Sequence, residues 1–215
     1  WLLVIAFVVG GFLRVFRVGS VPPGLYRDEA FTGMDALTTL REGPRVFYTS
    51  AFGREPLFTW LVAVSISILG ATPLAVRLPS IVVGCLTLAT LYLAARELWT
   101  VRVAVFATAV LAVTFWHVLF SRLGFRAILV PLVSSVGVWA TARAAKSGRH
   151  LWWMLGGASA GLLLYTYVAA RAALIPAVAM LAYAWRRRDE GFPSFLELVT
   201  FSVTALVVMA PLLAF

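Results

Sequence analysis

The segment LPSIVVGCLTLATLYLAA, residues 78–95, carries no charged side chain and decides the class of fold. A helix that crosses the hydrocarbon core of a bilayer needs about 20 mostly apolar residues. Further apolar runs that could cross a membrane lie at 1–16, 101–120, 127–145, 151–169, 171–185 and 195–215. The pattern predicts an all-α, polytopic bundle of transmembrane helices that forms one domain over residues 1–215.

The composition indicates that lipid is the solvent. Of the 215 residues, 62% are hydrophobic and 13% are charged, whereas soluble domains are roughly 45–50% apolar. The net charge of +9 would suggest a nucleic-acid partner in a soluble protein. Here the cations lie at the ends of apolar runs, where they indicate topology and contacts with membrane lipids. We therefore expect no nucleic-acid partner.

The chain begins and ends inside apolar runs, so we expect it to be the front part of a longer membrane protein, cut at both ends. Its single cysteine, Cys85, lies within an apolar run and excludes an internal disulfide. One cysteine and two histidines argue against a Cys/His zinc site.

Clustered cations predict the orientation of the helices. Basic residues concentrate at 96–102, 143–149 and 186–188, and the positive-inside rule places such loops in the cytoplasm. The loop 17–55 then falls outside, provided that Pro56–Gly70 does not fully cross. That apolar segment has only 15 residues, or about 22 Å of helix, so we favour a re-entrant or surface-lying helix over a span.

The first outer loop, 17–55, contains an expected amphipathic helix that lies on the membrane surface. Asp28 could cap its start, and Gly43 with Pro44 would end it after Arg41. One side of this helix would be apolar, formed by Ala30, Phe31, Met34, Leu37 and Leu40.

Three carboxylates in this loop are candidate catalytic residues: Asp28, Glu29 and Glu55. Acidic residues are rare so close to a bilayer, so their presence there suggests a function by default. A carboxylate at Asp28 could act as general base on an acceptor hydroxyl or amine. The structural alternatives are a helix cap for Asp28 and Glu29 and a surface ion pair of Glu55 with Arg54.

Arginines on the same outer face are candidates for binding a phosphate. Arg122 and Arg126 stand four residues apart, which would put them on one face if the backbone between them is helical. Arg171 follows Tyr167 at the outer end of a predicted span. A guanidinium fork suits phosphate, although these side chains could equally anchor the interface.

The ordered set of short motifs resembles the bacterial glycosyltransferase family 39, which is related to protein O-mannosyltransferases and lipid A aminoarabinose transferase. The matching residues are Pro22 to Ala30, Gly53 to Leu57, Val76 to Ser80, Phe115 to Arg126 and Tyr165 to Arg171. The resemblance covers nearly the whole chain in order.

The resemblance implies the C-type fold of membrane glycosyltransferases and inverting transfer outside the plasma membrane. The donor would be a sugar linked to polyprenyl phosphate, and the acceptor a lipid, glycan or protein. Asp28 would be the base that activates the acceptor, while Glu29 and Glu55 would assist, and Arg122, Arg126, Arg171 and Tyr167 would bind the donor phosphate.

Two departures from the family pattern bear on cofactors. Relatives often carry an Asp soon after the arginine of the second outer loop, whereas this chain continues as Ala127-Ile128-Leu129. Glu55 stands where relatives have a Lys or His before the proline. A resident metal is therefore not expected, although a divalent cation stays open as a cofactor. The chief alternative function is a transporter or flippase of lipid-linked substrates, which should show internal repeats and charges near the bilayer midplane.

Overall fold

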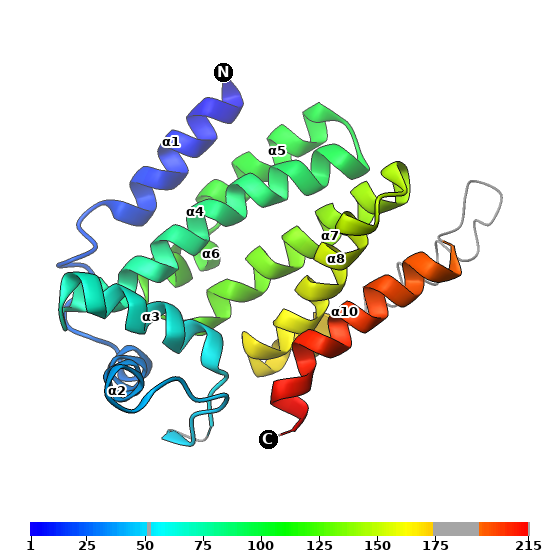
Figure 1. Cartoon of the computed structure of the whole chain (residues 1–215). Coiled ribbons are helices and arrows are strands. Elements are labelled where there is room, and N and C mark those ends of the chain that lie inside the picture. Colours follow the sequence, from blue (N-terminus) through cyan, green and yellow to red (C-terminus); the bar gives the residue numbers. More distant parts are fainter. Residues whose placement is uncertain (51–52, 174–193, 215) are drawn as a thin grey trace.

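A computed structural model describes residues 1–50, 53–173 and 194–214. The chain is a bundle of α-helices (Figure 1), and the only β-structure among the described residues is an isolated bridge between Tyr48 and Arg54. The helices are α1 (Leu2–Val15), α2 (Arg27–Glu42), α3 (Pro56–Leu69), α4 (Pro73–Leu98), α5 (Val101–Val113), α6 (Phe115–Arg122), α7 (Leu129–Ser147), α8 (His150–Leu162) and α10 (Phe195–Leu213). Short 3-10 turns follow α6 and α8, namely η2 (Arg126–Ile128), η3 (Leu163–Tyr165) and η4 (Val168–Ala173).

The predicted all-α membrane bundle is confirmed. Three helices are long and apolar enough to cross a bilayer, at Pro73–Leu98, Arg126–Ser147 and Phe195–Leu213. They contain the predicted spans 78–95 and 127–145 and most of 195–215. The predicted span 171–185, apart from its first three residues, and the basic cluster 186–188 lie outside the described residues.

The predicted span 101–120 is two helices rather than one. Helices α5 and α6 meet at 58° with Thr114 between them, and the pair could together form one broken span. At the break the Ala112 carbonyl accepts a hydrogen bond of 3.0 Å from Nη1 of Arg14, a buried cation of α1. A side chain from another helix thus satisfies a backbone group near the bend, which hydropathy alone does not reveal.

The predicted span 151–169 is also shorter than expected, because α8 ends at Leu162 after 13 residues and continues as 3-10 turns. Helix α8 packs very closely against α10. A Cβ added at Gly157 would come within 2.2 Å of the Phe201 carbonyl oxygen. Glycine is therefore required for this approach of the two backbones.

Helix α2 was predicted correctly as a helix within the segment 17–55, but its buried stripe differs from the predicted apolar face. The buried residues are Glu29, Thr32, Gly33 and Ala36. Ala36 joins an apolar core cluster with residues of α3, α4, η2 and α7. Met34 and Leu40 are exposed, as residues facing a membrane surface would be.

The bundle has two chemically different ends (Figure 1). The α4–α5 and α7–α8 turns, which carry the basic clusters 96–102 and 143–149, lie at one end, and α2 lies at the other. Ion pairs of Glu97 with Arg143 and Lys146 join the two basic turns. The fold therefore separates the clustered cations from the acidic loop, as the predicted topology requires.

Candidate functional site

Asp28 lies in the first turn of α2 and faces Arg54. Its Oδ1 accepts a hydrogen bond of 3.1 Å from Nη2 of Arg54, and its side chain remains 38% exposed. Arg54 is buried and also donates from Nη1 to the Asp28 carbonyl and to Oγ1 of Thr32. The carboxylate is thus held in place by a buried cation while part of it stays accessible.

The expectation that Asp28 caps α2 is wrong. The helix begins at Arg27 with Tyr26 as its N-cap residue, and Glu29 reaches back to accept the Tyr26 amide at 2.7 Å. Because Glu29 performs the capping, the Asp28 carboxylate is free of that task.

Glu55 and Arg126 form a second, mostly buried ion pair. Oε2 of Glu55 lies 3.1 Å from Nε of Arg126, but the contact does not have hydrogen-bond geometry. The Arg126 guanidinium lies over the Tyr167 ring, 5.2 Å from its centroid. Neither Nη atom of Arg126 donates to another residue in the described part of the chain.

The two pairs are neighbours. Burial lowers the pKa of Arg54, and the charge of Arg126 lowers it further, while Asp28 and Asp35 raise it. The influence of Arg126 on Arg54 places the two ion pairs close to each other. We call Asp28, Arg54, Glu55, Arg126 and Tyr167 the charged cluster.

The loop before Arg54 is fastened to α2 by side-chain hydrogen bonds. Ser50 donates to Oδ2 of Asp35 at 2.5 Å, and the hydroxyls of Tyr48 and Thr39 also meet. Gly53 has a φ of +92°, and a Cβ there would come within 2.7 Å of the Phe47 ring. This turn delivers Arg54 to α2, and the sequence did not predict its role.

Glu29, a predicted catalytic residue, is instead fully buried against Arg77 of α4. Its Oε1 accepts from Nε of Arg77 at 2.8 Å and from the Gly124 amide at 2.9 Å. Burial raises the pKa of the Glu29 carboxyl, but hydrogen bonds from Arg77, Gly124 and Tyr26 more than offset this, so the pKa lies below its ordinary value. The geometry favours a structural role, because no part of this carboxylate faces an open space.

Arg77 ties the entry loop to the bundle as well. Its Nη1 donates to the carbonyls of Val18 and Pro22, and its Nη2 donates to Gly24. The signal in the sequence was a lone cation at the start of the apolar run 78–95, which is expensive in a membrane protein unless it is paired.

Arg122, like Arg77, donates to backbone carbonyls and does not join the charged cluster. Its Nη1 donates to the Leu13 carbonyl at 2.7 Å and its Nη2 to the Val21 carbonyl at 2.9 Å. Arg122 and Arg126 do not share a helix face, since α6 ends at Arg122 and extended backbone follows at Leu123. Arg171 lies in η4, near Tyr167 in the chain, but its side chain is outside the described residues.

The described residues fit a divalent cation poorly. Within the described ranges no group of three or more His, Cys, Asp or Glu side chains gathers. The carboxylates of Asp28 and Glu55 each already face an arginine. A cation at this site would need ligands from elsewhere in the protein.

Comparison with known proteins adds a sequence match and a structural match. A family model described as dolichyl-phosphate-mannose-protein mannosyltransferase matches residues 53–215. No curated protein sequence matches the chain.

Two solved structures of the Archaeoglobus fulgidus oligosaccharyltransferase share the fold. One, tethered with an acceptor peptide containing the NVT sequon, has a TM-score of 0.70 at 15% identity over 98% of this chain and 33% of the other. The second, a complex with Zn and sulfate, has a TM-score of 0.71 at 17% identity over 98% of this chain and 35% of the other. The chain thus spans about a third of the length of the structures that it matches.

Proposed function

The chain belongs to the dolichyl-phosphate-mannose-protein mannosyltransferase family, and from that premise we propose that it transfers a sugar from a polyprenyl-phosphate-linked donor to an acceptor hydroxyl or amine. Membership supports a membrane glycosyltransferase, and the chain has the C-type fold of these enzymes. The reaction would take place on the extracytoplasmic face, with residues 1–215 as one transmembrane domain. The observation that carries the proposal is the charged cluster, which sets a carboxylate beside arginines at one end of the bundle.

Asp28 is the proposed general base. Its carboxylate would take the proton from the acceptor hydroxyl or amine as the acceptor atom attacks the anomeric carbon of the sugar. The bond between that carbon and the phosphate oxygen breaks, and polyprenyl phosphate leaves with the bonding electrons. A single displacement of this kind inverts the anomeric configuration.

Arg126 is the proposed phosphate ligand. Both of its Nη atoms are free within the described part of the chain, and the Tyr167 ring supports the guanidinium from one side. A planar fork can donate two parallel hydrogen bonds to phosphate oxygens. Arg54 adds positive charge, Glu55 orients Arg126, and Arg171 remains a candidate second ligand.

An aromatic row offers an apolar surface that leads away from Arg126. Consecutive ring pairs have centroids 5.3–6.0 Å apart, and the row comprises Tyr167, Phe125, Phe120, Trp116 and Phe115. Its far members, Phe115 and Trp116, are more than 60% exposed. A polyprenyl chain attached to the phosphate could lie along these rings, which supports a lipid-linked donor.

We expect Arg126→Lys to raise the KM for the donor about tenfold or more, with little change in the KM for the acceptor. A lysine keeps the charge but cannot present a planar fork, and losing a charge-assisted hydrogen bond costs about 1.5–3 kcal/mol. The assay is transfer of radiolabelled sugar from synthetic polyprenyl-phosphate donors by the full-length protein.

Arg122→Lys is the matched control, because Arg122 holds backbone carbonyls rather than the charged cluster. It should lower thermal stability and leave the donor KM near the wild-type value. An unchanged donor KM in Arg126→Lys would contradict the assignment of Arg126 as the phosphate ligand.

Site-directed thiol labelling tests the side of the membrane. In a Cys85→Ala background, a cysteine replacing exposed Arg41 should react with a membrane-impermeant reagent in intact cells, and one replacing Arg149 only after permeabilisation. Gly124 is unsuitable as a labelling position, since a Cβ there would meet the Val76 carbonyl oxygen at 3.0 Å. The reverse labelling pattern would place the charged cluster in the cytoplasm.

A further inference from the structure

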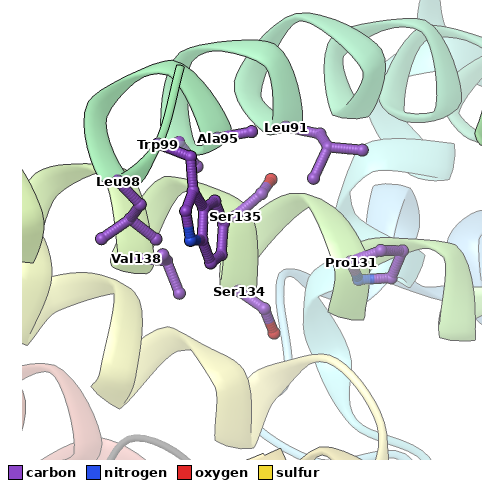
Figure 2. A pocket seen from close by; sticks show the side chains of 9 residues that line it. Leu91, Ala95, Leu98, Trp99, Pro131, Ser134, Ser135 and Val138 are labelled. Atoms are coloured by element: carbon purple, nitrogen blue, oxygen red, sulfur yellow. The ribbon is translucent and has the colours of Figure 1, made fainter. Parts of the chain in front are cut away.

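An apolar cleft of about 330 Å³ opens between α4 and α7. Its lining residues are Leu91, Ala94, Ala95, Leu98, Trp99, Pro131, Ser134, Ser135 and Val138. Figure 2 shows Leu98, Trp99 and Val138 at one end of this space and Pro131 at the other. None of the proposed catalytic or donor-binding residues lines it, so the proposed reaction leaves the cleft unexplained.

Polar contacts hold the two helices together at the cleft and beyond one end of it. In the cleft wall, the hydroxyl of the lining residue Ser135 meets the hydroxyl of Thr90 at 2.6 Å. Towards the basic turns, Glu97 pairs with Arg143 at 3.2 Å and with Lys146 at 3.3 Å. These contacts hold α4 against α7 around the cleft, whose lining includes the small side chains of Ala94 and Ala95.

At the end of the cleft where Trp99 lies, the apolar lining gives way to positively charged segments. This indole is 64% exposed, and tryptophan is enriched where hydrocarbon meets headgroups. The adjoining segments 96–102 and 143–149 contain five cations and one carboxylate, a net charge of +4. Arg96, Arg102 and Arg149 are exposed and have no ion pair within the described part of the chain.

We propose that this cleft holds one acyl chain of an anionic membrane phospholipid, whose headgroup binds the basic turns. An apolar slot that reaches Trp99 fits the chain, and the excess of cations fits a headgroup of net negative charge. Basic pockets between transmembrane helices commonly bind such headgroups. A zwitterionic lipid would match the slot but not the charge.

The test uses the full-length protein with phosphatidylglycerol that carries a photoreactive diazirine in its acyl chain. Crosslinks should map to 91–99 and 131–138, and phosphatidylcholine with the same chains should give far fewer. Each juxtamembrane cation contributes roughly a fivefold change in affinity. Arg96→Gln with Arg102→Gln should therefore weaken retention of phosphatidylglycerol about 25-fold in native mass spectrometry.

A variant with a filled cleft distinguishes binding of the acyl chain from binding of the headgroup. Ser134 makes no hydrogen bond through its side chain in the described residues, so Ser134→Leu should fill the slot and abolish the crosslinks without exposing a buried polar partner. The matched controls are Val110→Phe, on an exposed position of α5, and Arg17→Gln with Arg41→Gln, which make the same charge change elsewhere. Both controls should behave as the wild type.

Three outcomes would overturn the proposal. One is equal retention of phosphatidylcholine, and another is crosslinking that survives Ser134→Leu. The third is displacement of phosphatidylglycerol by an equal concentration of polyprenyl phosphate, which would make the cleft part of the donor site instead.

Discussion

We expect Asp28→Asn to lower sugar transfer by at least about a hundredfold in a protein that folds normally. The amide oxygen can still accept from Nη2 of Arg54, so the geometry of the side chain should survive. An amide cannot take a proton as a carboxylate does, and general-base catalysis typically contributes ~10²–10⁴-fold. The loss should appear in kcat, while the donor KM stays close to the wild-type value.

Asp28→Ala should fold as well, because Glu29 caps α2 and Arg54 also bonds the Asp28 carbonyl and Thr32. Asp35→Asn is the matched control, because Asp35 lies on α2 about two turns after Asp28. The amide oxygen of the variant can still accept the hydrogen bond from Ser50. That control should retain most of the activity. Near-full activity of Asp28→Asn would show that Asp28 is not the base.

The second large effect is expected on stability, at the buried pair of Glu29 and Arg77. Both side chains are only 1% exposed, and their atoms meet at 2.8 Å. Breaking a buried pair by removing one partner leaves an uncompensated charge and costs about 3–5 kcal/mol. Glu29→Ala and Arg77→Met should each lower the thermal midpoint of the full-length protein in detergent far more than Asp28→Ala does.

A double-mutant cycle separates the ion pair from ordinary packing. The double variant Glu29→Met/Arg77→Met should be less destabilising than the sum of Glu29→Met alone and Arg77→Met alone, by about 0.5–3 kcal/mol for residues in direct contact. Strict additivity would show that the two charges do not stabilise each other.

The pH dependence has a definite sign. The pKa of Glu29 is lowered in the folded state, so its contribution to stability is complete above the ordinary value of 4.5 and is lost as the pH falls through the lower, folded value. The wild type should therefore lose stability relative to Glu29→Gln only at pH below that ordinary value. A difference between the two that does not change from pH 7 to pH 3 would contradict the assignment.

The sequence by itself determined the class of the molecule. Apolar runs longer than any soluble core requires predicted a helical membrane domain, and α4, α7 and α10 follow from hydropathy and length. The clustered cations predicted that the acidic loop and the basic turns lie on opposite sides, provided that Pro56–Gly70 does not fully cross. Short motifs in a fixed order identified the family.

Tertiary structure alone decided which charged residues belong together. Glu29 and Asp28 are neighbours in sequence, yet one is buried against Arg77 and the other reaches Arg54. Side chains on consecutive residues of a helix point about 100° apart, so only packing against the loop before α3 and against α4 determines their partners.

The partners of the arginines likewise could not be predicted from the sequence. Arg122 and Arg126 looked equivalent at a spacing of four residues, but the helix ends between them, so one binds backbone carbonyls of residues 13 and 21 and the other faces Glu55. Partners 71 to 109 positions distant in the chain carry no signal in a single sequence. Their meeting is set by how the helices pack, because a buried guanidinium takes whatever acceptors the fold brings to it.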